Sequence, residues 1–267
     1  MKKYILIISI LVGFSSCEKD ADITIKEMPP QLVVSSMFSN NVNESYISLT
    51  MSKGFKRDSY EYTPITNAQV KATDNQGNII NFTANADGVY KTNTPAIPGS
   101  NYTLDIVKDA HHLVAVEEMK NVVVLQDFEI GQRSRHGSSL ILQFDDPSTD
   151  TNYFRIKIYV EDVNTPGSDY LLNDFITTDH LYDAQTHKLN VGRMHMQSSG
   201  IYKVHLIHIS KDAYKYYETL QNINNMGYGD SPFVSAVPGN PNTNIEGGIG
   251  YFATGAESVK EKLINVN

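Results

Sequence analysis

Short strand-like runs separated by tight-turn residues fill the chain from Gln31 onward, and this alternation most constrains its fold. Recurring runs of β-branched and aromatic residues are typical of an all-β sandwich, not of a helical or βαβ fold. The segments 74–77 and 85–88 both end in glycine, which adopts the positive φ of tight turns without steric cost. The strands expected in the first half are 32–38, 46–52, 69–74, 79–83, 88–91 and 102–108.

The mainly β body is expected to form two sandwich domains, the first over residues 31–125. Residues 64–72, 88–90 and 99–104 resemble the prealbumin-like or immunoglobulin-like sandwiches of extracellular bacterial proteins. Alternate residues of a strand share one face of the sheet, which identifies the inward positions. The side chains expected to fill this core are Val70, Ala72, Tyr90, Tyr102 and Leu104.

The second expected sandwich spans residues 126–267 and resembles a fibronectin type III domain. Its expected strands include 139–144, 152–160 and 200–209. Apolar and polar side chains alternate along the middle strand, which is the pattern of a strand buried on one face only. The four side chains expected to be buried there are Phe154, Ile156, Ile158 and Val160.

One helix is expected over residues 211–224, followed by a long loop. Ser210 can cap the helix, Asp212 lies in its first turn, and the segment contains no proline or glycine. Long connections without regular structure are often functional, so we expect a binding surface after the helix. The candidate apolar contacts for a partner or ligand are Tyr228, Phe233 and Tyr251.

The first 16 residues have the organisation of a cleaved export signal: Lys2 and Lys3, an apolar run, then small residues. The apolar run at 4–14 is far shorter than the roughly 20 residues that span a bilayer as a helix. Ser15 and Ser16 precede Cys17, the single cysteine, and this site resembles a lipobox. We therefore expect Cys17 to carry acyl chains such as palmitate, with residues 17–30 as a tether; two acyl chains suffice for stable anchoring.

The charge of the mature chain argues against a nucleic-acid function. Cleavage removes two of the 22 basic side chains, so 20 basic and 30 acidic side chains remain, a formal net charge of −10. Non-specific nucleic-acid binding depends on clustered Lys and Arg, which this chain lacks. With its one cysteine used as the anchor, the body must be stable through its core alone.

Several segments together resemble the Bacteroidota lipoproteins grouped as domain of unknown function 4249. They are the lipobox at Cys17, residues 64–70, 88–90 and 102–104, Glu117-Glu118-Met119, the helix start at 209–217 and the closing segment 244–252. The resemblance implies an outer-membrane lipoprotein, often encoded beside a TonB-dependent receptor, with no established enzymatic activity, catalytic residue or cofactor. The acidic residues after Cys17, among them Glu18 and Asp20, also resemble the tag that directs such lipoproteins to the cell surface.

Patterns for catalysis or metal binding are weak in this sequence. His205 and His208 belong to one strand and are expected on opposite faces, which disfavours a shared zinc ion. Asp145, Asp146 and Asp150 offer oxygen atoms without an EF-hand loop, and a solvent-facing turn is the simpler interpretation. There is no Gly-x-Ser-x-Gly elbow, and we expect neither a metal nor a cofactor.

Three hypotheses for function remain open. The first is a non-enzymatic accessory lipoprotein of a TonB-dependent transporter or another outer-membrane β-barrel complex, anchored in outer-membrane lipid and facing the cell surface. The alternative is an independent surface module that binds glycan or protein. A hydrolase whose site assembles from residues distant in the sequence is the third.

Overall fold

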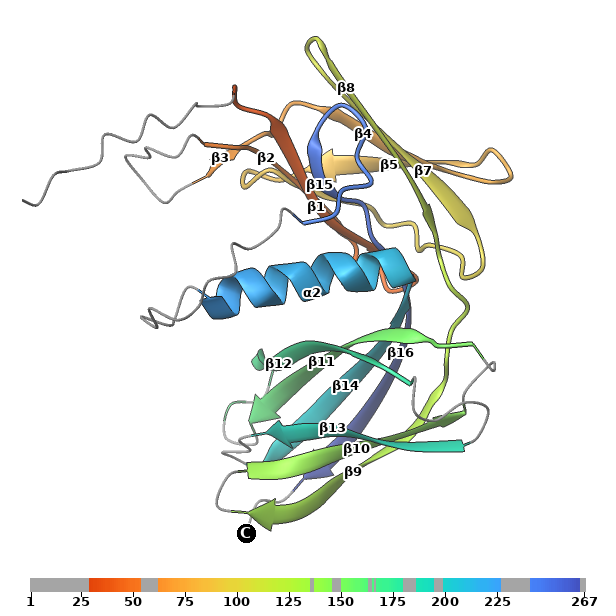
Figure 1. Cartoon of the computed structure of the whole chain (residues 1–267), viewed down its shortest axis with the longest axis vertical. Helices are drawn as coiled ribbons and strands as arrows, with labels where there is room; N and C mark the ends of the chain where they lie inside the picture. Colours follow the sequence, from red (N-terminus) through yellow and green to blue (C-terminus); the bar gives the residue numbers. More distant parts are fainter. Residues whose placement is uncertain are drawn as a thin grey trace, which may run out of the picture.

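A computed structural model describes residues 29–53, 62–134, 137–145, 150–162, 165, 167–179, 186–194, 199–226 and 241–264. The chain is mainly β, with one helix among these residues (Figure 1). The mainly β class and the helix were both predicted and are confirmed. Each strand named from the sequence is present, with ends that differ by at most two residues.

The first sandwich contains β1 (Leu32–Ser39), β2 (Tyr46–Met51), β3 (Thr63–Pro64), β4 (Gln69–Asp74), β5 (Ile79–Ala84), β6 (Val89–Lys91), β7 (Asn101–Lys108) and β8 (His111–Glu118). The second contains β9 (Leu125–Ser134), β10 (Gly137–Asp145), β11 (Tyr153–Asp162), β12 (Asp169–Thr178), β13 (Thr186–Met194) and β14 (Gly200–Ile209). Helix α2 (Lys211–Met226), β15 (Ile249–Tyr251) and β16 (Thr254–Ile264) follow.

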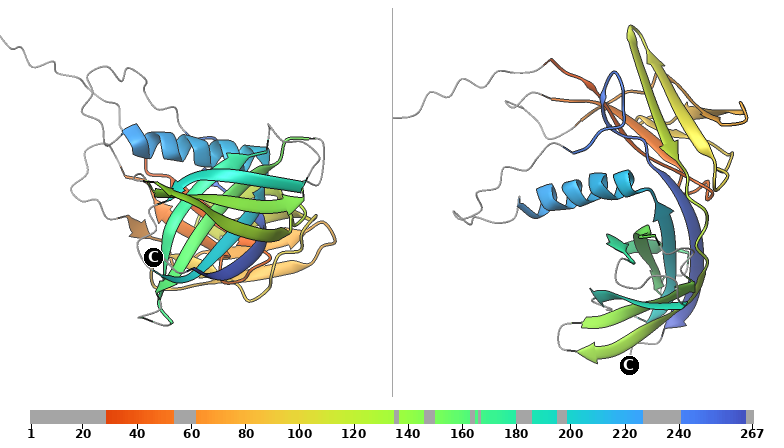
Figure 2. Two further views of the ribbon diagram at one scale, coloured as in Figure 1. Left: turned by 90° about the horizontal axis from the view of Figure 1, so that it is seen from below. Right: turned by 45° about the vertical axis from the view of Figure 1, so that its right-hand side comes forward.

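The two sandwiches share one continuous sheet. Its 13 strands run in the order β12-β11-β14-β16-β1-β2-β6-β5-β4-β7-β8, with β15 and β3 beside β1 and β2. The strands β9, β10 and β13 form a separate three-stranded sheet. It packs against β11 and β14 of the long sheet, and the two layers make the second sandwich. Helix α2 lies between the two sandwiches (Figures 1 and 2). The long sheet therefore links the domains through hydrogen-bonded strands, not only through a linker.

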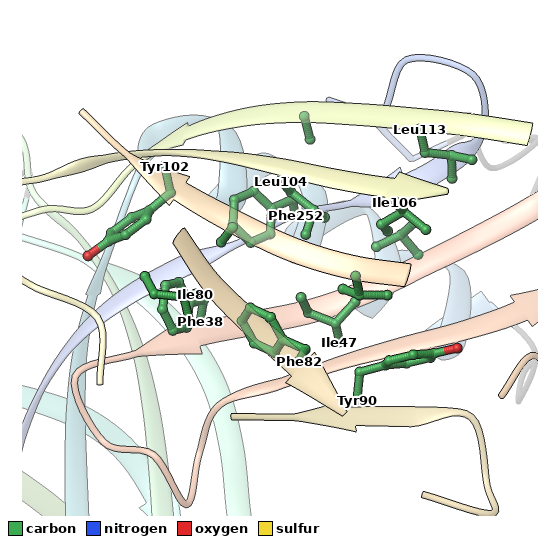
Figure 3. Packing of buried hydrophobic residues seen from close by; sticks show 14 of the residues in the cluster. Phe38, Ile47, Ile80, Phe82, Tyr90, Tyr102, Leu104, Ile106, Leu113 and Phe252 are labelled. Carbon is green, nitrogen blue, oxygen red and sulfur yellow. The ribbon is translucent and has the colours of Figure 1, made fainter. Parts of the chain in front are cut away.

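The first core is filled by alternate residues of β1, β2, β4, β5 and β7 (Figure 3). The ring of Phe38 lies edge-on to Tyr102 at a centroid distance of 4.9 Å and to Phe82 at 5.4 Å. The five side chains predicted for this core are all buried. A tight turn joins β4 to β5, with Gly77 at a φ of 88° and the Asp74 carboxylate accepting the backbone N–H groups of Gln76 and Asn78.

The end of the chain returns to the first sandwich, which corrects the predicted boundaries. Ile245, Phe252 and Ala256 belong to the first core, and β15 and β16 both pair with β1 in parallel. The approach is so close that a Cβ on Gly250, whose φ is 109°, would lie 1.9 Å from the Val34 carbonyl oxygen. Residues 126–267 are thus not one separate sandwich, because the segment around 245–252 completes the first sandwich.

The second core lies between the three-stranded sheet and β11, β14 and β16. Phe154, Ile156, Ile158 and Val160 are buried in it, as the alternation predicted. The opposite side of β11 was expected to face solvent, but Lys157 is also buried there. The difference arises because β1, the 40–45 turn and α2 cover part of that face, which a strand pattern cannot reveal.

Helix α2 begins where the sequence predicted. The Ser210 hydroxyl oxygen accepts a hydrogen bond from the Ala213 backbone N–H at 3.1 Å, which is the geometry of an N-cap. Ala213, Tyr216 and Tyr217 pack into a third apolar cluster with residues from β1, β14 and β15. The helix is therefore held at the junction of the two sandwiches.

Candidate functional site

A buried carboxylate at the end of β8 joins four separate segments of the chain. Glu117 accepts hydrogen bonds from the Asn244 amide at 3.1 Å, from the Tyr251 hydroxyl at 3.1 Å and from the Ser210 hydroxyl. Burial raises the pKa of Glu117, and these three hydrogen bonds only partly oppose that shift. The start of α2, the segment before β15 and β15 itself are thus fixed to the first sandwich at one point.

Tyr251 is the one predicted contact residue that the structure describes, and its position contradicts that role. Its side chain is 2% exposed, and burial together with Glu117 raises the pKa of its hydroxyl. Its ring stacks on Tyr216 at a centroid distance of 5.0 Å. Tyr251 is therefore a junction residue without surface for a ligand. Cys17, Tyr228 and Phe233 lie outside the described residues.

A second buried polar group connects the β1–β2 turn to the second sandwich. The Lys157 ammonium lies 2.5 Å from a carboxylate oxygen of Glu44, and the Tyr159 hydroxyl donates to the same carboxylate at 3.3 Å. Burial would raise the pKa of Glu44, but the hydrogen bond and charge of Lys157 outweigh it, so the pKa lies below its ordinary value. This ion pair therefore adds a side-chain contact between the two sandwiches to the strand pairing of the long sheet.

One further contact crosses the same junction, and another lies beside it within the second sandwich. The Asn40 side chain donates to the Glu257 carbonyl at 3.0 Å and accepts the Glu257 N–H at 2.7 Å, while the Glu257 carboxylate pairs with the His205 ring. Arg155 contacts Asp174 through two hydrogen bonds of 2.8 and 2.6 Å. These groups are directed at one another, so we interpret them as structural.

The histidines lie as the strand alternation predicted. His205 faces Glu257, whereas the Nδ1 of His208 lies 2.9 Å from the Asn121 carbonyl on the other face of the strand. Within the described ranges, no group of three His, Cys, Asp or Glu residues is placed to hold a metal ion. In that same part of the chain, no helix is both long and apolar enough to cross a bilayer.

Further from the first sandwich, no other described segment covers the face of β12, β11, β14 and β16 that carries Lys157, and we call this region the outer face. The strand registers place its residues side by side: Tyr159 opposite Leu171 and Lys203, and Ile201 opposite Leu263. The apolar side chains are well exposed, with Leu263 at 61%, Leu171 at 47% and Val259 at 41%. The outer face consists of Tyr159, Glu161, Asp169, Leu171, Ile201, Lys203, Val259, Glu261 and Leu263.

The charges of the outer face are unbalanced. The Lys203 ammonium lies 3.2 Å from Asp169 and 3.6 Å from Glu161. The hydrogen bond from Asp169 raises the pKa of Lys203, with smaller contributions from Glu261 and Glu161. Three carboxylates against one ammonium leave a formal charge of −2 around exposed aliphatic side chains. This surface suits a partner with apolar and basic groups.

Two surface hollows are also present. One of about 490 Å³ lies at the junction beside the start of α2, and its lining includes Lys120, His208 and Lys211. The other, of about 470 Å³, lies on β5 and β6 of the first sandwich. The second has an amide- and hydroxyl-rich lining.

Comparison with known families decides the classification. The family model for the domain of unknown function DUF4249 matches residues 18–261. The chain belongs to the DUF4249 family. The DUF4249-like segments recognised in the sequence at Glu117, at the helix start and at 244–252 meet around the Glu117 carboxylate.

No curated protein matches this DUF4249 chain. Among solved structures, a two-domain fibronectin type III segment of chicken tenascin is 12% identical, with a TM-score of 0.21. The match covers 68% of this chain and 91% of the tenascin chain. The FN1–FN3 domains of chicken CNTN1 are 10% identical with a TM-score of 0.21, covering 87% of this chain and 66% of theirs. At such low TM-scores these likenesses carry no argument about function.

No motif in the sequence pointed to the Glu44–Lys157 pair or to the outer face. Glu44 and Lys157 are 113 positions apart, and only folding brings them together. The sequence did contain a pattern that could have indicated a strand of the outer face. Along residues 258–263, Val259, Glu261 and Leu263 alternate with Ser258, Lys260 and Lys262.

Proposed function

We propose that this DUF4249 protein is a non-enzymatic lipoprotein, anchored in the outer membrane through Cys17, that docks on an outer-membrane protein through its outer face. The expected partner is a TonB-dependent transporter or a related β-barrel complex, with the body facing the cell surface. The observation that carries the proposal is the exposed outer face, where aliphatic side chains of β12, β14 and β16 lie beside three carboxylates and one ammonium.

The position of the outer face suits a tethered protein. Strand β1 begins at Leu32 on the end of the first sandwich away from the second, and the outer face belongs to the second (Figure 1). The stretch from Cys17 to Leu32 can extend to about 50 Å at roughly 3.3–3.6 Å per residue. A lipid on Cys17 would therefore leave the second sandwich free to meet a neighbouring membrane protein.

The chemistry of the outer face supports a protein partner. Exposed apolar patches rimmed by polar residues mark interaction sites more often than inert surface. Leu263, Ile201 and Val259 supply apolar contact area, while Glu161 and Asp169 favour a partner that presents Lys or Arg. Lys203 lies between these two carboxylates and offsets one of their charges.

Affinity purification of the lipidated protein in mild detergent tests docking. We expect recovery of a β-barrel protein in roughly equal amount, and a fall of about tenfold or more for Leu263→Asp, equivalent to about 1.4 kcal/mol. Val116→Asp is the matched control, because Val116 is equally exposed, at 62%, on β8 of the other sandwich. Recovery of the lipoprotein alone, or an equal loss with both variants, would contradict docking through the outer face.

The anchor and its orientation are tested separately. Metabolic labelling with a palmitate analogue should tag the natural protein and spare Cys17→Ala. Protease treatment of intact cells should cleave a surface-facing body. Equal labelling of both proteins would remove the anchor from the proposal, and cleavage only after lysis would place the body in the periplasm.

A further inference from the structure

The hollow on the first sandwich forms where two strands separate. Strands β5 and β6 pair only at Thr83–Lys91 and Ala84–Tyr90, after which the chain turns away from β5. The ladder therefore stops before it reaches the first half of β5. The resulting hollow of about 470 Å³ falls within the usual size range of small-ligand sites.

The floor of the hollow is the outward side of a well-anchored strand. Asn81 and Thr83 point outward on β5, whereas Ile80 and Phe82, which alternate with them, are buried in the first core. On its other edge β5 is paired with β4 from Ile79 to Phe82. The side chains of the floor are thus presented from a rigid backbone.

The polar side chains around the hollow have unused hydrogen-bonding capacity. Within the described residues, the side chains of Asn81, Thr83 and Asn93 form no hydrogen bond. The Lys91 ammonium donates to the Asn43 carbonyl at 3.2 Å, which uses one of its three donors. It also lies 5.9 Å from the centre of the Tyr46 ring, at the start of β2.

We infer that this hollow binds carbohydrate. Each primary amide and hydroxyl both donates and accepts, which matches the paired donor and acceptor character of neighbouring sugar hydroxyls. Ile79, at 61% exposure, offers an apolar contact to the C–H face of a sugar ring. The described lining holds no carboxylate, so it lacks the charged oxygen ligands that favour Ca²⁺.

Lys91 extends the range of sugars that fit. Lys91 is part of the lining, and its ammonium has two N–H donors left for the carboxylate of a uronic acid. A neutral oligosaccharide would use the amides and Thr83 instead. The ligand class is therefore a neutral or singly acidic oligosaccharide. Its site is separate from the outer face, so its failure would leave the docking proposal untouched.

Binding is tested with the mature full-length protein. The probes are defined soluble oligosaccharides of glucose, mannose, N-acetylglucosamine and glucuronate, followed by saturation-transfer NMR and calorimetry. We expect at least one series to bind, with affinity about tenfold weaker in Asn81→Ala/Asn93→Ala. Asn101→Ala is the matched control, because Asn101 is an exposed asparagine on β7 of the same sandwich.

The outcomes separate the alternatives. No binding by any of the four sugar series would overturn the inference, as would sugar binding that the Asn81/Asn93 variant retains in full. Binding of extended peptides in place of sugars, with the same sensitivity to Asn81, would reassign the hollow to strand addition at β5. Unchanged thermal unfolding of the variants shows that any loss is local.

Discussion

Two lysines on the same face of one sheet have opposite environments. Lys157 on β11 lies under the β1–β2 turn and pairs with Glu44, whereas Lys203 on β14 lies lower on the sheet, among the exposed carboxylates of the outer face. The strand alternation treats them alike. What differs is the segment that packs on each lysine. The β1–β2 turn of the first sandwich contacts Lys157, whereas the ion pairs of Lys203 are with carboxylates of its own sheet. One sheet face thus serves both as a domain junction and as open surface.

Breaking the buried pair should give the largest effect on stability. Lys157→Met keeps the aliphatic stem but leaves the Glu44 carboxylate without its partner, and such losses cost about 3–5 kcal/mol. Equilibrium unfolding in urea measures the change. The double variant with Glu44→Gln should recover much of the stability, because no unpaired charge remains. A loss below about 1 kcal/mol in the single variant would mean that the pair behaves as a surface ion pair.

The pH dependence of the two buried carboxylates should have opposite signs. The pKa of Glu44 is lowered from 4.5, so its ionised form adds stability above that value, and this is lost as pH falls through the folded-state pKa. The pKa of Glu117 is raised from 4.5, so its protonated form adds stability that is lost as pH rises through the folded-state pKa.

Unfolding curves of Glu44→Gln and Glu117→Gln, measured from below 4.5 to neutral pH, check these signs. The stability deficit of Glu44→Gln relative to the natural protein should shrink toward acid pH. For Glu117→Gln, stability relative to the natural protein should improve toward neutral pH. Parallel curves for both variants would contradict the assigned environments.

Lys203→Met should change stability least, by no more than about 0.5 kcal/mol, because its ion pairs lie at the surface, where solvent screens them. It should nevertheless alter docking, since removing the ammonium leaves three uncompensated carboxylates on the outer face. We expect stronger recovery of a basic partner, measured in the detergent purification with unfolding in urea as the control. A large loss of stability would show that Lys203 resembles Lys157 after all.

The sequence predicted features that depend on local pattern. The strand at 152–160 was found because its apolar residues alternate, and the Ser210 cap was found because serine precedes a segment without proline or glycine. Strand β16 was not found, since Lys- and Glu-rich residues such as 258–262 have low β propensity. Its pairing with β14 and β1 determines its conformation.

The candidate sites were mostly beyond reach of such patterns. Tyr251 looked available because it follows a loop, yet its hydroxyl is buried against Glu117, which is 134 positions away. The hollow on β5 exists because β6 pairs over so few residues, and pairing length is a tertiary property. Contacts distant in sequence therefore decided which polar residues were structural and which were free to bind.

The parallel pairing of the first strand with the last ones has a consequence for biosynthesis. The Ser36 hydroxyl accepts the Ala253 N–H, a contact that spans 217 positions. The first core cannot close before Phe252 has been synthesised, because that ring is part of it. During synthesis the first core therefore stays incomplete until residue 252 has left the ribosome, so its native packing forms late.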